Sequence, residues 1–491
     1  MKAFQRIAQN TSYIFAAQFI NKLLNVVFVV YAARLLGATN YGLFVLVSTM
    51  VLICSTFTHL GIRAMIVRKI SKDMSSARQL LGNVLAFRLC LSGFIYALLV
   101  FFARVSGYPQ EVTKLIDIAG ILIIVNSFTE SFETIYISHE KMRPWGTFDV
   151  LHRLVFTIAV ITALWLGFRL KAVFSLNVLV SAMFAGALGF FIWKNIFRFK
   201  LEFDFLIIKG VLRESILFFF AVLLNTLIIK VDILMLSFVG GPMEPAKAIG
   251  YYGPAHNILL ALMILPRSVN MALLPFVSQK IYLDHESVKR AIEKATKFLI
   301  ITICLPLIFA VSFFSKEIVL TVFGANFIQS TDALMILGWA YAFYALNIPA
   351  QSVLGSSTEL KKFIPLLALV LLLNVFFNYI LIPKYSYVGA AIATCIVFFV
   401  GFIGRFYFLR RILEVKSSDM KDYIKFVIIL VIILGSAFLI KSFIPRSVLL
   451  IWIIIVYISC LYIFGLIVKK DITAATAWIA KKITKGRRAL N

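Results

Sequence analysis

Long apolar segments alternate with short polar connections along the whole chain. A hydrocarbon core of about 30 Å needs about 20 apolar residues in each helix that crosses it. About fourteen segments meet this requirement, at 11–35, 41–62, 82–104, 114–138, 149–167, 173–193, 215–239, 251–275, 298–315, 331–355, 364–382, 387–409, 422–440 and 447–468. The pattern therefore predicts an all-α polytopic membrane protein with about 14 transmembrane helices.

The apolar segments repeat within the chain. The sequence GATNYGLFV around Tyr41 recurs as KAIGYYGPAH around Tyr252, 211 positions later. The connection HEKMR after the fourth segment matches TELKK after the tenth, 219 positions later. Six is an even number, so both copies enter the membrane from the same side, as in the parallel repeats of transporters. We predict a six-helix N-terminal lobe over 1–200, a six-helix C-terminal lobe over 201–412, two additional helices over 413–468 and a basic tail over 469–491.

Two lysines lie deep in matching segments. Lys22 and Lys230 are 208 positions apart, each near the middle of the first segment of its lobe. Inserting a charged side chain at the centre of a bilayer costs about 2.5 kcal/mol on insertion scales. A lysine kept at this depth in both copies of the repeat is therefore expected to have a function. It indicates a pathway for a negatively charged substrate. The structural alternative for Lys22 is a pairing inside a helix interface.

Polar residues follow one face of the first segment. Thr11, Gln18, Asn21, Lys22 and Asn25 fall within an arc of about 100° at the helical period. Lipid would penalise such a stripe, so we expect it to face protein or a water-filled cavity.

The seventh segment carries a second polar set. It contains Asn225, Thr226, Lys230 and Asp232. Lys230 and Asp232 are two positions apart and point to nearly opposite sides of a helix, so they do not pair with each other. Two interpretations of Asp232 are open: it neutralises a cation from another helix, or it binds a proton or a sodium ion.

Four arginines lie within apolar segments. Arg267 follows a proline, which allows a helix to bend, and we predict that it is a cation on the cytoplasmic side of a cavity. Arg88, Arg153 and Arg405 lie close to the cytoplasmic ends of their segments. They either extend to the membrane surface or, for Arg88 and Arg153, act as secondary cavity cations.

Two acidic residues share a face of the fourth segment. Glu130 and Glu133 are three positions apart, toward the cytoplasmic end. They either pair with Arg88 or Arg153, or line an entrance as a proton relay. The sequence contains no metal-ligand spacing, nucleophile triad or phosphate-binding loop, so we predict no enzyme, no metal and no cofactor beyond coupling to H⁺ or Na⁺.

Composition fixes the predicted orientation. The chain has 491 residues, a mean hydropathy of +0.97 and a net charge of +27. Lys and Arg concentrate in the connections on the side of the two termini, which predicts a multi-pass protein of the cell membrane with both termini in the cytoplasm. The excess charge is thus explained by topology and by attraction to anionic membrane lipid, and we expect no nucleic-acid partner. The five cysteines are scattered singly, as small packing residues.

Three stretches carry a family resemblance: VDILMLSFVGGPMEPAKAIGYYGPAHNILLALMILPRSVNMALLPFVS, ARLLGATNYGLFVLVSTMVLICSTFTHLGI, and the sequence from FGANFIQSTDALMILGWAYAF to NVFFNYILIPKYSYVGAAIAT. The chain resembles, over about 1–412, the polysaccharide-transport flippases that carry O-antigen units, within the multidrug/oligosaccharidyl-lipid/polysaccharide exporter superfamily. The resemblance implies two pseudo-symmetric six-helix lobes in a V shape around a central cavity. It also implies a polyprenyl-pyrophosphate-linked glycan as substrate, flipped to the outer leaflet, and a polysaccharide polymerase and assembly proteins as partners.

In such a cavity Lys22, Lys230 and Arg267 would meet the pyrophosphate, and Asn21, Asn25 and Asn225 would meet sugar hydroxyls. Gln18 belongs to the same polar face. Asp232 or Glu130 would sense the driving gradient.

Three rival functions remain at this point. A peptidoglycan precursor (lipid II) flippase would also have fourteen helices and a cationic cavity. A drug or cation exporter of the same superfamily would need an acidic or aromatic cavity, whereas the deep charges here are mainly positive. A membrane glycan polymerase or ligase would carry a large outer loop with catalytic residues, and the outer connections are too short for one.

Overall fold

The structure is a computed structural model that describes residues 2–356, 360–413, 421–440 and 446–463. Within these ranges it contains helices and no strand, which confirms the all-α class. The first helices are α1 (Lys2–His59), α2 (Ile62–Lys72), α3 (Ala77–Val105), α4 (Gln110–Ser138), α5 (Met142–Trp165) and α6 (Leu170–Asn195). They are followed by α7 (Phe205–Phe238), α8 (Pro245–Leu262), α9 (Ile264–Lys280), α10 (His285–Leu299), α11 (Leu305–Val322), α12 (Ser330–Leu346), α13 (Ile348–Ser356), α14 (Leu360–Ile412), α15 (Lys421–Ile440) and α16 (Arg446–Ile463).

The helices are long and apolar enough to cross a membrane. Ten helical stretches of the described residues meet this criterion by length and composition. Two of them, in α1 and α14, contain a break, at Gly37 with a φ of 71° and at Ser386 with a φ of 50°. Both breaks fall between pairs of predicted segments, and at Gly37 the glycine accepts a positive φ without strain. The total of fourteen crossings stays a prediction.

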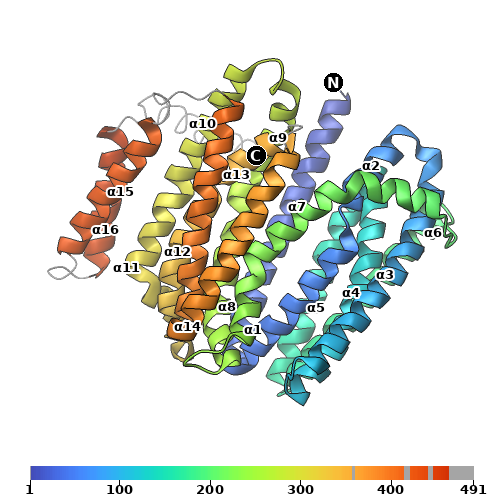
Figure 1. Ribbon diagram of the computed structural model, residues 1–491, viewed down its shortest axis with the longest axis horizontal. Helices are drawn as coiled ribbons and strands as arrows, with labels where there is room; N and C mark the ends of the chain where they lie inside the picture. The colour runs from blue at the N-terminus through green and yellow to red at the C-terminus, as the bar shows by residue number, and fades with distance from the viewer. Residues whose placement is uncertain (1, 357–359, 414–420, 441–445, 464–491) are drawn as a thin grey trace, which may run out of the picture.

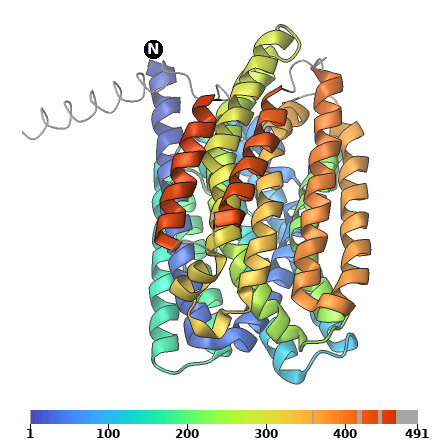
Figure 2. The ribbon, with the colours of Figure 1, turned by 90° about the vertical axis from the view of Figure 1, so that its left-hand side faces the viewer.

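The helices form two groups with α1 and α7 between them (Figure 1). One group holds α2 to α6, the other holds α8 to α14, and α15 and α16 lie at the outer edge of the second (Figures 1 and 2). α7 begins beside α2 and ends against α8 and α14. This agrees with the V-shaped arrangement of two lobes that the family resemblance implies. The lobe boundaries at 200 and 412 and the tail over 469–491 stay predictions, and the tail lies outside the described residues.

The lobes meet at the end of the bundle opposite the N-terminus. There the second half of α1 crosses α8 at a distance that only glycine permits. A Cβ added to Gly42 would lie 1.8 Å from the carbonyl oxygen of Ala246, and one added to Gly250 would lie 1.9 Å from that of Ala38. Both distances are far inside contact range, so the two backbones touch directly. The predicted orientation places this contact on the outer side of the membrane.

Polar bonds hold the same contact together. The Asn257 side-chain amide donates a hydrogen bond to the Tyr41 hydroxyl over 3.1 Å. Arg34 on α1 donates to the carbonyl oxygens of Val322, over 2.9 Å, and Thr321, at the end of α11. A cation is favoured there because unpaired carbonyls and the helix dipole make the end of a helix negative. The repeated Tyr-Gly sequences therefore belong to the surfaces through which the two lobes meet.

A polar cap marks the connection between α2 and α3. The Asp73 carboxylate accepts hydrogen bonds from the hydroxyl and backbone N–H of Ser75, over 2.6 and 3.0 Å. These bonds favour the ionised form and hold the pKa of Asp73 below its usual value. The chain turns sharply here, from one helix into the next.

Candidate functional site

Two adjacent chambers lie between the lobes. The first, of about 520 Å³, is bounded by α1, α5 and α9, and we call it the basic chamber. It is lined by Gln18, Asn21, Lys22, Asn25, Asp149, His152, Arg153, Ile264, Arg267, Ser268 and Met271. Each helix contributes one cation, so three positive side chains from both lobes face one space.

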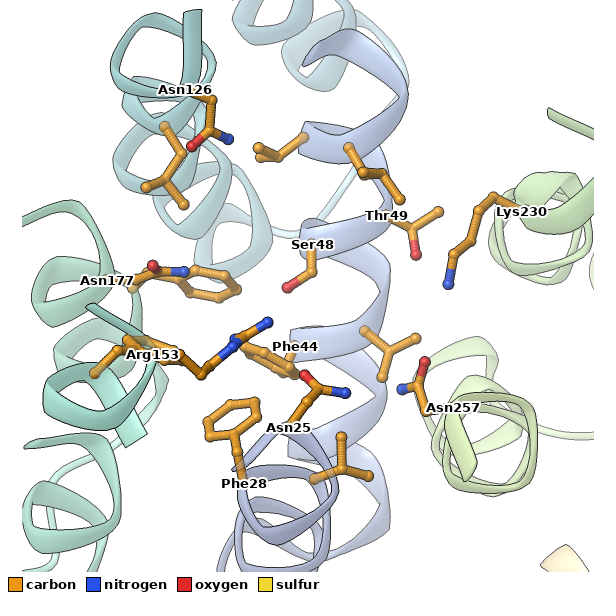
Figure 3. Close-up of a pocket in the computed structure, with 17 residues that line it drawn as sticks. Asn25, Phe28, Phe44, Ser48, Thr49, Asn126, Arg153, Asn177, Lys230 and Asn257 are labelled. Atoms are coloured by element: carbon orange, nitrogen blue, oxygen red, sulfur yellow. The ribbon is translucent and has the colours of Figure 1, made fainter. Parts of the chain in front are cut away.

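The second chamber, of about 380 Å³, lies deeper between the lobes, and we call it the amide chamber (Figure 3). Its polar lining consists of Asn25, Asn126, Asn177, Asn257, Ser48, Thr49, Arg153 and Lys230. Asn25 and Arg153 line both chambers, which makes the two spaces neighbours with a shared wall. Asparagine and hydroxyl side chains offer both donors and acceptors, so this lining suits a ligand rich in hydroxyl groups.

The basic chamber keeps an excess of positive charge. Lys22, Arg153 and Arg267 face it, and Asp149 is the single carboxylate in its lining. Asp149 accepts a hydrogen bond from Asn21 over 2.6 Å. None of the three cations forms an ion pair within 4.0 Å of a described residue. Charges that are removed from bulk water and lack a partner favour the entry of an anion.

Lys230 reaches the amide chamber from α7 and is held in place by a histidine. Its side chain is buried, and its ammonium lies 3.3 Å from Nε2 of His256. Nδ1 of the same ring lies 3.3 Å from the Tyr341 hydroxyl. A neutral imidazole with its proton on Nδ1 accepts from the ammonium and donates to the tyrosine. The lysine is therefore positioned by a neutral partner, and it forms no ion pair within 4.0 Å among the described residues.

Asp232 lies on the other side of α7, fully buried in the C-terminal lobe. Its carboxylate accepts hydrogen bonds from the hydroxyls of Tyr252 and Thr394, each over 2.7 Å, and from the amide of Asn378 over 3.1 Å. Among the described residues, no cation pairs with it. The contacts found for Asp232 are with neutral donors, so they do not support the interpretation that it neutralises a cation from another helix. The proton or sodium interpretation stays a prediction.

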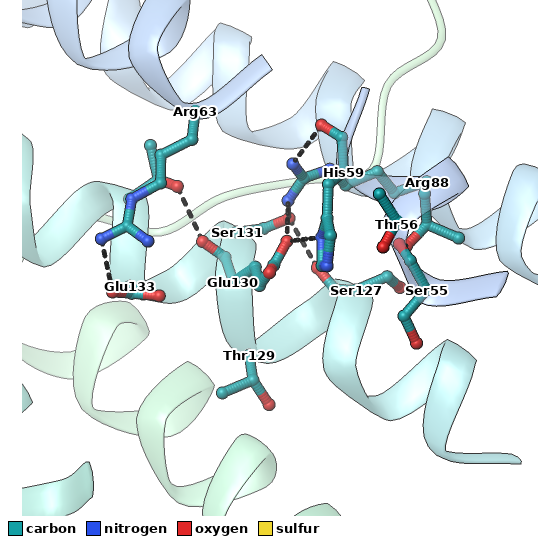
Figure 4. Close-up of polar contacts among 12 residues, drawn as sticks. Ser55, Thr56, His59, Arg63, Arg88, Ser127, Thr129, Glu130, Ser131 and Glu133 are labelled. Atoms are coloured by element: carbon teal, nitrogen blue, oxygen red, sulfur yellow. Dashed lines mark hydrogen bonds and ion pairs between the residues drawn. The ribbon is translucent and has the colours of Figure 1, made fainter. Parts of the chain in front are cut away.

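Arg88 is not a cavity cation. It is enclosed within the N-terminal lobe with 1% of its surface exposed (Figure 4). Its guanidinium donates to the Ser131 hydroxyl over 2.9 Å and to the His59 carbonyl over 3.2 Å, and lies 3.9 Å from Glu130. The serine-rich face of α4 and the end of α1 thus offer it partners inside the lobe, so it neither lines a chamber nor extends to the membrane surface.

The two acidic residues of α4 are paired (Figure 4). Glu130 contacts Arg88 and the ring of His59, and Glu133 accepts a hydrogen bond from Arg63 over 2.5 Å. The expected pairing of Glu130 with Arg88 is confirmed. The partner of Glu133 differs from the predicted Arg88 or Arg153, because the start of α2 brings Arg63 to it. Neither glutamate lines the two chambers.

Of the other predicted residues, some lie on a helix face that lines a chamber and one does not. Gln18, Asn21, Lys22 and Asn25 lie together in the basic chamber as the periodicity of α1 requires. Asn225 lies outside both chambers. It is five positions from Lys230, or about 140° around the helix, and so presents another face of α7. Its predicted contact with the ligand is therefore wrong for these chambers.

Sequence reasoning missed much of the lining. The overlooked polar residues of the two chambers are Ser48, Thr49, Asn126, Asp149, His152, Asn177 and Asn257; His256, which holds Lys230 but lines neither chamber, was overlooked as well. Asp149 and His152 share a face of α5 with Arg153, a stripe that the sequence analysis did not combine, whereas the other residues are spread over α1, α4, α6 and α8. These residues could have been found from the sequence as amide or charged side chains far from the ends of apolar segments. Such a side chain is costly in a membrane unless it faces a polar partner or water.

Comparison with known proteins is consistent with this architecture. Residues 7–280 match the family described as polysaccharide biosynthesis protein. The chain is 20% identical to the probable low-salt glycan biosynthesis flippase Agl15 of Haloferax volcanii, over 84% of this chain and 85% of that protein. It is 22% identical to the capsular polysaccharide biosynthesis protein CapF of Staphylococcus aureus, over 83% of this chain and all of that protein. A match at 26% identity to the uncharacterized membrane protein MJ1068 of Methanocaldococcus jannaschii spans 39% of that protein.

Solved structures share the fold. The lipid II flippase MurJ in its inward closed conformation superposes with a TM-score of 0.74 at 17% identity. The superposition covers 94% of this chain and 99% of that one. At this identity the likeness shows the fold alone.

Proposed function

The chain belongs to the polysaccharide biosynthesis protein family, and on that premise we propose that it is a flippase for polyprenyl-pyrophosphate-linked oligosaccharides. It would carry these units from the cytoplasmic to the outer leaflet for surface polysaccharide synthesis. The observation that carries the proposal is the net positive chamber that adjoins an amide-lined one. A lipid-linked glycan has the same two parts, an anionic linkage and a polar sugar chain.

The pyrophosphate would bind in the basic chamber. Lys22, Arg153 and Arg267 can surround it from three helices and both lobes. Hydrogen bonds between ionised partners are about twice as strong as neutral ones, and guanidinium groups match phosphate oxygens in pairs. The pyrophosphate would replace the missing counter-charge, so binding would offset the cost of the buried cations.

The sugars would occupy the amide chamber. Asn25, Asn177 and Asn257 can exchange hydrogen bonds with sugar hydroxyls in place of water. Lys230 adds a cation there, suited to an acidic sugar or to the second phosphate. The polyprenyl tail would stay in lipid between the lobes, where its apolar surface is not exposed to water.

Transport would proceed by alternating access between the two lobes. The contact of α1 with α8 closes the end that we assign to the outer side, and the lobes would rock to open it. A proton or sodium gradient is the proposed driving force.

Two rivals share the fold. A lipid II flippase is the nearer one, because MurJ superposes well. The names of relatives that match over most of this chain, a glycan biosynthesis flippase and a capsular polysaccharide biosynthesis protein, favour the polysaccharide substrate instead. An exporter of cationic drugs is disfavoured, because three cations face one carboxylate in the basic chamber.

Binding to the purified full-length protein in nanodiscs tests the proposed function. The probe is a farnesyl-diphosphate disaccharide, compared with the same glycolipid lacking both phosphates. We expect Arg153→Gln to weaken binding of the probe by about 10- to 100-fold, since one charge-assisted bond contributes about 1.5–3 kcal/mol. The control is Arg104→Gln, at an exposed arginine beside Asp117. Equal binding of the phosphate-free glycolipid would refute recognition of the anionic linkage.

Asp232→Asn tests the assigned role in coupling. The amide keeps the shape but not the charge, so the variant should still transfer substrate down its gradient and lose stimulation by an imposed ion gradient. One unit charge moved across 100 mV contributes about 2.3 kcal/mol, or about a 50-fold accumulation ratio. This stimulation is measured as the ratio of substrate transfer in proteoliposomes with a proton or sodium gradient to transfer without one. Asp117→Asn is the control. Full gradient stimulation of Asp232→Asn would exclude this residue as the sensor.

A further inference from the structure

A small side pocket opens beside both chambers, within the N-terminal lobe. It has a volume of about 50 Å³ and lies between α4, α5 and α6. Asn126 belongs to its wall and to that of the amide chamber, while Asp149 and His152 belong to its wall and to that of the basic chamber. The pocket therefore lies where a linkage in the basic chamber would continue into a glycan.

One wall of the side pocket is aromatic. Trp145, Phe148 and Phe184 line it, and the two phenylalanines pack edge to face with their ring centres 6.4 Å apart. The His152 ring contacts Phe184 at 5.3 Å between centres. These contacts hold Phe148, Phe184 and His152 against one another, so this part of the wall is preformed.

The pocket also has polar lining residues with unused hydrogen-bonding capacity. The side-chain amide of Asn126 has no hydrogen-bond partner among the described residues. Asp149 receives one bond from Asn21, and a carboxylate accepts several. The Thr129 hydroxyl donates to the carbonyl of Val125 over 3.1 Å, which leaves its oxygen able to accept. The pocket thus offers acceptors, one amide donor and an apolar surface within one small space.

We propose that this side pocket receives the acetamido group of the sugar attached directly to the diphosphate. The amide N–H would donate to Asp149, the carbonyl would accept from Asn126, and the methyl would cover Trp145. The pocket, at about 50 Å³, has about a tenth of the volume of the basic chamber at about 520 Å³, so it suits a small substituent of the sugar and not a whole sugar ring. A hydroxyl alone would leave the aromatic wall uncovered.

Connectivity supports the same assignment. The carbon that bears the acetamido group of a 2-acetamido sugar is bonded to the carbon that carries the diphosphate. With the diphosphate among Lys22, Arg153 and Arg267, that substituent lies within reach of Asp149 and His152, which line both spaces. This inference rests on the proposed function and specifies the first sugar of its substrate.

Binding of three farnesyl-diphosphate monosaccharides to the full-length protein in nanodiscs tests the inference. The probes carry N-acetylglucosamine, glucose or glucosamine. The wild type should bind the acetamido probe about tenfold more tightly than the glucose probe, as expected for one small group in a matched pocket. Trp145→Ala should lose this preference and bind the glucose probe as the wild type does. Trp193→Ala, at a tryptophan that stacks with Arg198 outside the pocket, should keep it.

Thr129→Leu is the second variant, because it fills the pocket without removing an aromatic residue, and it should also lose the preference. Equal binding of the three probes by the wild type, or tighter binding of the glucosamine probe, would overturn the inference while the proposed function stands. Failure of all three to bind would instead count against the proposed function. Retention of the preference by both Trp145→Ala and Thr129→Leu would place the recognition of the sugar elsewhere.

Discussion

Replacing Lys22 and Lys230 together with alanine should reduce transfer of lipid-linked glycan by about 100-fold or more, because each charge-assisted bond contributes about 1.5–3 kcal/mol. Lys22 faces the basic chamber and Lys230 the amide chamber, so the pair acts on both parts of the proposed path. Lys230 is held by neutral His256 rather than by an acid, so its removal leaves no unpaired buried carboxylate. The variant should therefore still insert and fold.

Transfer is measured with a fluorescent lipid-linked oligosaccharide in proteoliposomes, at matched amounts of inserted protein. The control replaces Lys171 and Lys247 with alanine, since both are exposed lysines in the first turns of α6 and α8, outside the chambers. Normal transfer by the Lys22 and Lys230 double variant would show that the deep lysines do not contact the substrate.

Replacing Gly250 with valine should have the second large effect, by preventing closure of the outer side. A Cβ at this position would lie 1.9 Å from the carbonyl oxygen of Ala38 on the other lobe. Overpacking of a close contact costs about 1–3 kcal/mol, which shifts a conformational equilibrium about 5- to 150-fold. The lobes should separate there, and transfer should fall because the cycle can no longer return to the closed outer side.

Thiol labelling measures this shift. In a background without native cysteines, Ser48→Cys places a thiol in the amide chamber. A membrane-impermeant reagent added outside should leave it protected in the parent and label it when Gly250→Val is added. Gly93→Val is the control, since a Cβ there meets no atom within 4 Å. Unchanged protection with Gly250→Val would contradict the assignment of this contact as the outer closure.

Helical periodicity was the most informative feature of the sequence for the site. It placed Gln18, Asn21, Lys22 and Asn25 on one face, and that face lines the basic chamber. One segment sufficed for this prediction, because four polar residues on an apolar helix define a direction without knowledge of any neighbour.

Helical periodicity did not predict which side chains form hydrogen bonds or ion pairs with residues of other helices. Arg88 resembles Arg153 in type and depth, yet one is enclosed by Ser131 and Glu130 while the other faces both chambers. The difference depends on how α1, α3 and α4 pack, which no local pattern encodes. Asp232 shows the same limit, since its donors come from α8 and α14.

The internal repeat predicted two lobes but not their contact. The matching Tyr-Gly sequences indicated duplication, and the structure shows that their surroundings meet at Gly42 and Gly250. Single amides such as Asn126 and Asn257 escaped notice, because each lies on a different helix and the sequence does not show that these helix faces meet. Their common role is visible only when four helices are brought around one space.

The most direct test of the central claim is transfer by the wild-type protein alone. Purified full-length chain in proteoliposomes should expose a polyprenyl-diphosphate oligosaccharide from the inner leaflet to an external membrane-impermeant quencher, beyond the fraction quenched in protein-free vesicles. The same glycolipid without its phosphates should not move. Quenching equal to that of protein-free vesicles, or equal movement of the phosphate-free glycolipid, would contradict a flippase that binds its substrate through a cationic chamber.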